Sequence, residues 1–336
     1  MSLATFGTAS VSAGTCSDWK ERSFFREATV EGVVDCLDGG ADPNARGRYW
    51  TGTRLHAAAE EAQDASIIAA LLLAGADPNA VGPYGVTPLS IAVRRGYHVE
   101  AWSKPDLGVE IVATLLHFDA DPNSRDSNGC TPLHEAAGEP FIHPAIIPNL
   151  LHGGAEPDVR GCSRYSTPLH AAIFGANIST IAALLDDGAD PNLHDNDGNT
   201  PIRNAILSIN DPGSAADVVS LLLAADADPN VAGTGHDQRL PLHIAAYYHG
   251  DNPRLVVALL NAGADPNATD EFGNLALHIV TDQYYSDWQL ADQVAVIDIM
   301  IDAGADKDMQ NAAGIHPDVE GVRERYRRFG KDTTAR

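Results

Sequence analysis

The histidines are the residues of this sequence with the widest capacity for chemistry, because an imidazole can bind a metal, transfer a proton or donate a structural hydrogen bond. The chain has 13 histidines. A subset recurs at one position of a repeated phrase: His56, His134, His170, His243 and His278. A recurring position indicates a recurring structural task, so we interpret this subset as hydrogen-bonding residues of the fold.

Two short motifs resemble metal sites, but each lacks a required ligand. His134 and Glu135 begin like the helix of a zinc protease and have no second histidine at the required spacing. The segment 195–199 begins like a calcium loop, but Ile206 stands where the closing glutamate would be. We therefore predict neither a metal site nor a cofactor.

The sequence contains no local motif of an enzyme. A glycine-rich phosphate loop, a nucleophile elbow and a Ser-x-x-Lys element are all missing from it. We predict that the protein is not an enzyme. One alternative stays open, an enzyme or small-ligand site assembled from the long loops 97–102 and 284–288, because such sites need no local motif. His98 and His249 are its candidate titratable residues.

The chain of 336 residues is strongly acidic, with a net charge of −24. Such a surface repels the phosphates of nucleic acids and of anionic membranes. No apolar run approaches the roughly 18 residues that a membrane helix needs. We therefore predict no nucleic-acid or membrane partner, and we expect a charged partner protein to present a basic patch.

Four cysteines, Cys16, Cys36, Cys130 and Cys162, lack the spacing of a metal or redox motif. Four thiols are few for a disulfide-stapled scaffold of this length, so we expect a reducing compartment and a cytoplasmic location. The segment 1–16 has neither the charged start nor the apolar core of a secretion signal.

Two repeated phrases indicate the elements that position these residues. The first is Gly-Ala-Asp-Pro-Asn or a variant, with its third residue at Asp42, Asp77, Asp121, Glu156, Asp190, Asp228, Asp265 and Asp306. The second is Thr-Pro-Leu-His or a degenerate form, which begins at Thr53, Thr87, Thr131, Thr167, Thr200, Leu240, Leu275 and Ile315. Repetition at this spacing predicts a stack of small, similar units.

The residues of the phrases explain the local structure that they predict. Thr131 can cap a helix through its hydroxyl, and Pro132 suits the first helical position, where a missing N–H costs nothing. A second apolar stretch, such as 181–185, predicts a second helix that ends at a glycine. Each unit is thus a turn, a helix, a loop and a helix, and one unit cannot bury its apolar face alone.

The two phrases together resemble ankyrin repeats over roughly residues 20–320. The resemblance implies an all-α solenoid of stacked helix-loop-helix units with short β-hairpin turns. It also implies that hairpins and first helices line a concave groove. We divide the chain into a flexible tail (1–17), an N-terminal capping repeat (18–44), seven repeats (45–308), and a truncated C-terminal capping repeat with a basic tail (309–336).

Several units depart from the pattern. Arg54 replaces the proline of the first full unit, and Arg203 replaces the histidine of another. Leu240 and Leu275 stand where the capping threonine is expected. These departures leave open what replaces the missing groups.

The repeats vary in length mainly between their two helices, where the phrase-to-phrase spacing runs from 23 to 34 residues. Such insertions should project from the edge opposite the hairpins, and insertions of this kind often form binding surfaces. They carry aromatic residues suited to protein contacts: Tyr97, Trp102, Tyr247, Tyr248, Tyr284, Tyr285 and Trp288. The alternative is that these rings pack on the helix ends beneath them.

The hairpin tips form a second candidate surface. Basic and aromatic residues occupy the early tips: Arg46, Arg48, Tyr49, Trp50, Tyr84, Arg164 and Tyr165. Later tips are acidic, as at Asp195, Asp270 and Glu271. A groove of opposite charge at its two ends could orient a partner. The alternative is a solvated turn surface of low selectivity.

These observations favour a non-enzymatic scaffold, monomeric in isolation, that binds a partner protein through the concave hairpin surface and the aromatic insertions. A second hypothesis is an acidic inhibitor or immunity-type protein that blocks a basic partner. The third is the enzyme or small-ligand binder described above.

Overall fold

The computed structural model describes residues 16–47, 52–95, 104, 106–162, 166–234, 239–283 and 289–329. Within these ranges the chain forms helices and turns, and extended pairing there is limited to an isolated antiparallel bridge between Arg46 and Thr53. The predicted all-α class is confirmed. The chain divides into two compact units, Met1–Glu156 and Pro157–Arg336.

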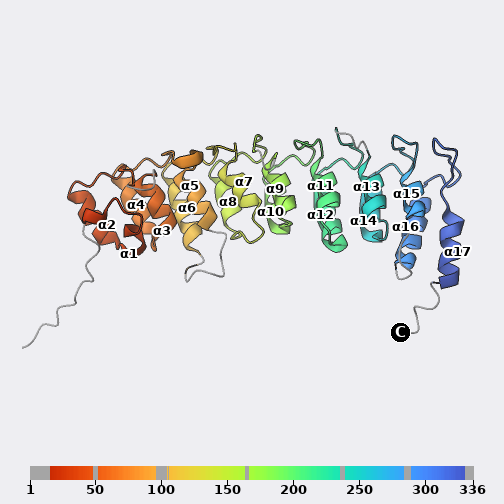
Figure 1. Cartoon of the computed structure of the whole chain (residues 1–336), viewed down its shortest axis with the longest axis horizontal. Coiled ribbons are helices and arrows are strands. Elements are labelled where there is room, and N and C mark those ends of the chain that lie inside the picture. The colour runs from red at the N-terminus through yellow and green to blue at the C-terminus, as the bar shows by residue number, and fades with distance from the viewer. Residues whose placement is uncertain are drawn as a thin grey trace, which may run out of the picture. The chain divides into compact units, whose positions relative to one another are not determined.

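The first unit begins with a short turn and small helices and continues as helix pairs (Figure 1). Its elements are η1 (Cys16–Asp18), α1 (Phe24–Glu27), α2 (Val30–Asp38), α3 (Arg54–Glu61), α4 (Ala65–Leu73), η2 (Pro83–Gly85), α5 (Pro88–Arg95), α6 (Leu107–His117), α7 (Pro132–Ala137) and α8 (Ile146–His152).

The second unit repeats the same helix pair and ends with a single unpaired helix (Figure 1). Its elements are α9 (Pro168–Phe174), α10 (Ile178–Asp186), α11 (Pro201–Ser208), α12 (Pro212–Ala224), α13 (Pro241–Tyr248), α14 (Pro253–Asn261), α15 (Ala276–Asp282), α16 (Leu290–Asp302) and α17 (Val319–Phe329). None of the helices in the described part of the chain is long and apolar enough to cross a membrane.

The helices pack in two layers within each unit. First helices contact first helices, as α3 with α5 and α13 with α15, while second helices contact second helices, as α4 with α6 and α14 with α16. Fully buried alanines, such as Ala57 and Ala58, give the first helices a small face that permits close packing. Larger buried residues, such as Ile67 and Leu71, fill the layer of second helices.

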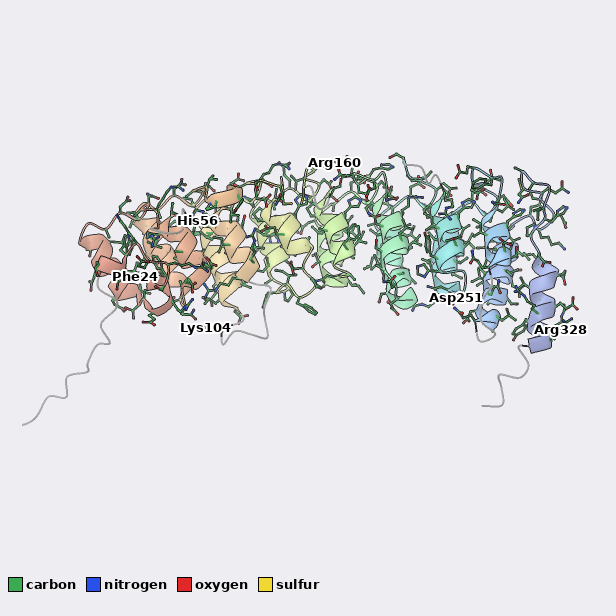
Figure 2. All side chains as sticks on the ribbon, viewed as in Figure 1. Phe24, His56, Lys104, Arg160, Asp251 and Arg328 are labelled. Atoms are coloured by element: carbon green, nitrogen blue, oxygen red, sulfur yellow. A yellow bond between two sulfur atoms is a disulfide. The ribbon has the colours of Figure 1, made fainter. Side chains whose placement is uncertain are left out.

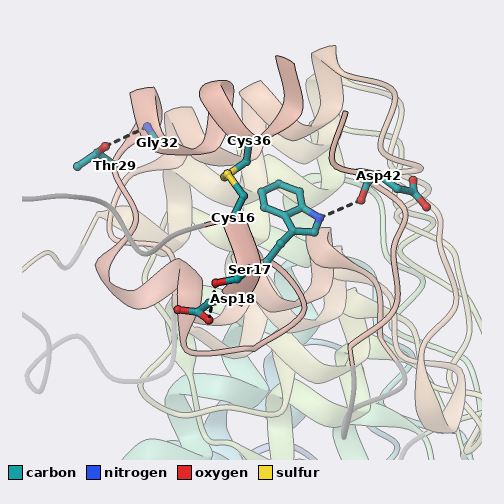
Figure 3. Close-up of a disulfide and its surroundings, with 8 residues drawn as sticks. Cys16, Ser17, Asp18, Thr29, Gly32, Cys36 and Asp42 are labelled. Atoms are coloured by element: carbon teal, nitrogen blue, oxygen red, sulfur yellow. Dashed lines mark hydrogen bonds between the residues drawn. A yellow bond between two sulfur atoms is a disulfide. The ribbon is translucent and has the colours of Figure 1, made fainter. Parts of the chain in front are cut away.

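An aromatic cluster closes the start of the first unit. The rings of Trp19, Phe24 and Phe25 pack in edge-to-face and tilted contacts with centroids 5.1–5.7 Å apart, and all three side chains are buried. The Trp19 indole N–H donates to the carbonyl oxygen of Asp42 at 3.0 Å (Figure 3). This cluster covers the apolar end that the first repeat would otherwise expose.

The cysteines correct the expectation of free thiols. Cys16 and Cys36 form a disulfide that joins η1 to α2 beside the aromatic cluster (Figure 3). Cys130 and Cys162 are also disulfide-bonded, so none of the cysteines is free. Counting residues misled the prediction, because bond formation depends on the approach of two side chains in space.

The inter-helix loops lie at the end of the helices that is remote from the hairpins, as the spacing of the phrases predicts. In the first unit Lys104 marks this end, in the loop between α5 and α6 (Figure 2). In the second unit Asp251 marks it, in the loop between α13 and α14 (Figure 2).

Candidate functional site

Recurring histidines join several of the first helices to the hairpins that follow them. His56 accepts the Thr53 backbone N–H at Nδ1 (3.1 Å), and its Nε2 lies 3.1 Å from the carbonyl oxygen of Val86, to which it donates. His278 makes the same pair of bonds, with the N–H of Leu275 at 3.1 Å and the carbonyl of Ile315 at 3.0 Å. The interpretation of these residues as structural is confirmed.

Burial controls the charge of several of these rings. Loss of hydration lowers the pKa of His56, His170 and His243 below the ordinary value, which keeps the rings neutral at neutral pH. A neutral ring has one N–H and one bare nitrogen, as the bonds of His56 require. The buried rings therefore serve the fold and offer no exposed acid or base.

The asparagines of the first phrase bind neighbouring repeats together. In the second unit Asn230 donates to the carbonyl of Gly263 at 2.9 Å and accepts the N–H of Asp265 at 2.9 Å. Asn267 makes the corresponding two bonds to the next repeat, with the carbonyl of Gly304 and the N–H of Asp306, at 2.8 Å each. The side-chain amide suits this task, because it donates and accepts at once.

Two arginines replace missing members of the second phrase. Arg54, at the proline position, is fully buried and donates to the carbonyls of Trp19 (2.5 Å) and Glu21 (3.3 Å) in the N-terminal cap. Arg203, at the histidine position, is also buried and donates to the carbonyl of Arg239, which follows the next hairpin. Arg54 and Arg203 therefore preserve links between neighbouring repeats.

A groove of about 950 Å³ opens on the second unit. It runs over the end of α13, the hairpin tip 270–274, the exposed side of α15, the tip 311–316 and the start of α17. Its lining includes Arg239, Tyr247, Tyr248, Glu271, Phe272, Asp282, Ile315 and Arg325.

Exposed apolar side chains form part of this groove. Tyr248 is 51% exposed, Phe272 62% and Ile315 59%, although each is large enough to anchor a contact. Tyr247 and Tyr248 form an edge-to-face pair with centroids 4.9 Å apart. The guanidinium of Arg239 lies 4.9 Å from the ring centroid of Tyr247, within the range of a cation–π contact.

The acidic side chains of the groove divide into two kinds. Asp270 accepts backbone N–H groups of its own hairpin, and Asp318 accepts the N–H of Gly321 at the start of α17. Glu271 and Asp282 are exposed, and neither makes a hydrogen bond or ion pair with the described part of the chain. No group of His, Cys, Asp and Glu among the described residues is arranged to hold a metal ion.

In the first unit, acidic side chains of the first helices form ion pairs. Arg22 and Arg26 each pair with Glu61 at 3.0 Å, and Arg94 pairs with Glu135 at 2.5 Å. Burial raises the pKa of Glu135, while the hydrogen bond from Arg94 opposes that rise. The acids of these first helices are thus neutralised within the molecule, whereas Glu271 and Asp282 in the groove are not.

The structure gives the positions of some of the residues predicted for binding. Tyr247 and Tyr248 are the last residues of α13, next to the inter-helix loop as the sequence pattern predicts, and both line the groove. Arg46 is exposed at the first hairpin and donates to the carbonyl of Val81 at 3.3 Å. Outside the described residues lie Arg48, Tyr49, Trp50, Tyr97, Trp102, Arg164, Tyr165, Tyr284, Tyr285 and Trp288.

Tyr84 stands at a hairpin tip and is 81% exposed. Its backbone has a φ of 58°, a region that most side chains avoid, and its carbonyl accepts the N–H of Ser127 at 2.7 Å. Phe272 occupies the corresponding place in its own hairpin, where its carbonyl accepts the N–H of Ala312 at 3.0 Å. The sequence places Phe272 on a hairpin tip, although it was not among the predicted contact residues.

Comparison with known proteins establishes the family. The model described as "Ankyrin repeats (3 copies)" matches residues 55–160, 101–193 and 141–233, and "Ankyrin repeats (many copies)" matches 222–280. The chain belongs to the ankyrin-repeat family. Repeats of this family generally mediate protein–protein interactions, through the extended surfaces that stacked repeats create.

Individual relatives match about half of this chain or less, and the chain spans only a small part of their length. Neurogenic locus notch homolog protein 1 from Mus musculus is 31% identical over 172 residues, which are 50% of this chain and 6% of that protein. The Xenopus tropicalis protein of the same name is 34% identical over 149 residues, 43% of this chain and 5% of that protein. Putative palmitoyltransferase ZDHHC13 from Danio rerio is 31% identical over 173 residues, 50% of this chain and 24% of that protein.

A solved structure supports the same architecture. The ankyrin repeat domain of Bcl-3, a member of the IκB protein family, matches with a TM-score of 0.55 at 24% sequence identity. The match covers 72% of this chain and 99% of the Bcl-3 domain. It confirms the ankyrin-repeat solenoid that the phrases predict.

Proposed function

We propose that this protein is a non-enzymatic interaction module that binds a partner protein in the groove of the second unit. The observation that carries the proposal is the combination, in one groove, of half-exposed Tyr248 and Phe272 with the unpaired carboxylates of Glu271 and Asp282. Large exposed rings supply contact area at low entropic cost, and charges at their side supply orientation.

The charges favour a basic partner. The whole chain has a net charge of −24, and the groove adds free carboxylates to that background. Charge attraction accelerates the encounter of the two proteins and weakens as salt screens it. The partner surface that fits is therefore a basic patch with apolar or aromatic neighbours.

Specific observations favour two further hypotheses. An acidic inhibitor that occludes a basic partner would use the same charges, and it would be recognised by loss of the partner's activity on binding. A small-ligand binder would use the same volume of about 950 Å³. The groove opens over hairpin tips and helix ends, an arrangement more suited to a chain segment than to an enclosed small molecule.

Other parts of the prediction stay predictions. The contacts predicted at the insertion residues from Tyr97 to Trp288, and at the tips of Arg46 and Tyr84, stay predictions. Monomeric state stays a prediction as well. A cytoplasmic location stays the default of the sequence, but the Cys16–Cys36 disulfide weighs against it, since such bonds persist in oxidising compartments.

The test is affinity capture by immobilised variants of the full chain, quantified by mass spectrometry at low and high salt. Phe272→Ala removes a groove ring, and Phe141→Ala is its matched control, because Phe141 is 78% exposed in an inter-helix loop of the first unit. We expect a partner that Phe272→Ala loses, that Phe141→Ala keeps, and whose capture falls at about 0.5 M NaCl.

Each other outcome points elsewhere. Loss of the partner with Phe141→Ala alone would assign binding to the insertion edge. Equal capture by all variants would refute the groove as the binding site.

A further inference from the structure

We infer that the groove recognises an arginine side chain in an extended segment of the partner, and that it selects arginine over lysine. The inference rests on the proposed function and makes it specific, because it names the group that the groove receives. It is carried by the positions of Tyr247, Tyr248 and Phe272 together with Glu271 and Asp282.

The molecule itself shows how a guanidinium fits against these rings. The guanidinium of Arg239 lies 4.9 Å from the ring centroid of Tyr247. Tyr248 meets Tyr247 edge to face and is 51% exposed, so it presents a second aromatic surface toward the groove. Phe272, 62% exposed, adds a third ring from the neighbouring hairpin tip. The site is thus aromatic on more than one side.

Free carboxylates accompany these rings. The carboxylates of Asp270 and Asp318 accept hydrogen bonds from backbone N–H groups, so they hold the loops in place. Glu271 and Asp282 are exposed and unpaired within the described part of the chain. An incoming cation therefore finds acceptors that need not give up an internal bond.

The geometry of the groove discriminates between an arginine and a lysine side chain of the partner. A guanidinium is planar, stacks on a ring with its face, and directs paired N–H groups at a carboxylate from its edge. An ammonium is a strongly hydrated point charge that cannot make both contacts in this way. Exposed rings and free carboxylates that line one groove therefore favour arginine. Ile315, 59% exposed in the same groove, suits an aliphatic neighbour in the bound segment.

The first experiment selects ligands without presupposing a partner. A phage library of random peptides, each about 12 residues long, is selected on the immobilised full chain and counter-selected on Tyr248→Ala. We expect arginine to dominate one position of the enriched peptides. Synthetic versions in which that arginine becomes lysine or citrulline should bind about tenfold more weakly, because each loses the stack or the charged pair.

Variants of the protein identify the site of binding. The isosteric change Glu271→Gln with Asp282→Asn removes both free charges from exposed positions, and it should weaken the arginine peptide about tenfold. Tyr248→Phe keeps the ring and should bind within about twofold of the unaltered chain. The matched charge control is Asp186→Asn with Asp187→Asn, at exposed residues where α10 ends, and it should leave binding unchanged. Circular dichroism verifies that each variant is folded.

The outcomes separate the inference from the proposed function. Enriched peptides that depend on Tyr248 but tolerate lysine in place of arginine would overturn the arginine selectivity and keep the groove as a binding site. Enriched peptides without a basic residue would do the same. A selection that finds no peptide dependent on the groove would refute both.

Discussion

Polar side chains in the repeated phrases form bonds that hold one repeat to the next. His278 uses both ring nitrogens on backbone groups, one in its own helix and one after the following hairpin. The exposed Asn267 makes both of its amide bonds to the following repeat, with the carbonyl of Gly304 and the N–H of Asp306. Such residues are costly to leave unpaired, so a single wrong group at these positions has a measurable effect.

Asp158 is a position where this network is incomplete. It stands where other repeats have asparagine, and its carboxylate accepts the N–H of Asp190 at 2.9 Å. A carboxylate cannot donate, and the carbonyl of Gly188 has no side-chain donor in the described residues to match the one that Asn230 gives Gly263. Asp158→Asn should raise the free energy of unfolding by about 1 kcal/mol.

Urea unfolding measures this change, and Asn192→Asp is the reciprocal control. Asn192 donates to the carbonyl of Asp226 at 3.0 Å, so its replacement by aspartate should lower stability by a similar amount. If both substitutions shift the midpoint in the same direction, the donated bond does not explain the difference.

The buried histidines predict how stability responds to pH. The pKa of His56, His170 and His243 is lower in the folded chain than in the unfolded chain, chiefly because of burial. Protonation therefore favours the unfolded state, and the contribution is complete above about pH 6.5 and lost as the pH falls. We expect a lower urea midpoint at about pH 5.5 than at about pH 7.5. Equal midpoints would contradict this account.

Among the elements, the N-terminal cap depends most on contacts that are remote in sequence. The short turn η1 is joined to α2 by the disulfide, to the first hairpin segment by Trp19, and to α3 by Arg54. A four-residue helix such as α1 is too short to be stable alone, so these links hold the cap in place.

Removal of the disulfide should loosen this cap first. Cys16→Ser with Cys36→Ser eliminates a cross-link between residues 20 apart, and we expect stability to fall by about 2–4 kcal/mol. Hydrogen exchange should accelerate at the Val33 amide in α2 and stay unchanged in α14 of the second unit. Equal protection of α2 with and without the bond would show that the aromatic cluster alone secures the cap.

The net charge of the whole molecule acts on every unit. At −24, like charges repel in the compact state, and the surface ion pairs such as Arg254–Asp217 each offset little of this. Sodium chloride should therefore raise the stability of the folded chain, because screening reduces the repulsion.

The measurement is the urea midpoint at about 20 mM and about 500 mM NaCl, with a rise expected between them. The same salt increase should weaken partner capture, so folding and association respond in opposite directions. A midpoint that falls with salt would mean that the ion pairs outweigh the repulsion.

Sequence reasoning located some of the groove and missed the rest for an identifiable reason. Tyr247 and Tyr248 were predicted as contact residues at the inter-helix edge, and they line the groove from the end of α13. Phe272 was placed on a hairpin tip but not among the predicted contacts, and Asp282 and Ile315 were not selected, because each looks ordinary in its own repeat. Their common position appears when consecutive repeats stack and bring α13, α15 and two hairpin tips to line one groove.

The sequence by itself determined the repeat, the helix pair and the task of the recurring histidines, because these depend on spacings of a few residues that cap helices and close turns. The tertiary structure alone decided the Cys16–Cys36 pairing, the substitute links of Arg54 and Arg203, and the membership of the groove. Those features join residues that are distant along the chain, and their approach depends on how neighbouring units pack.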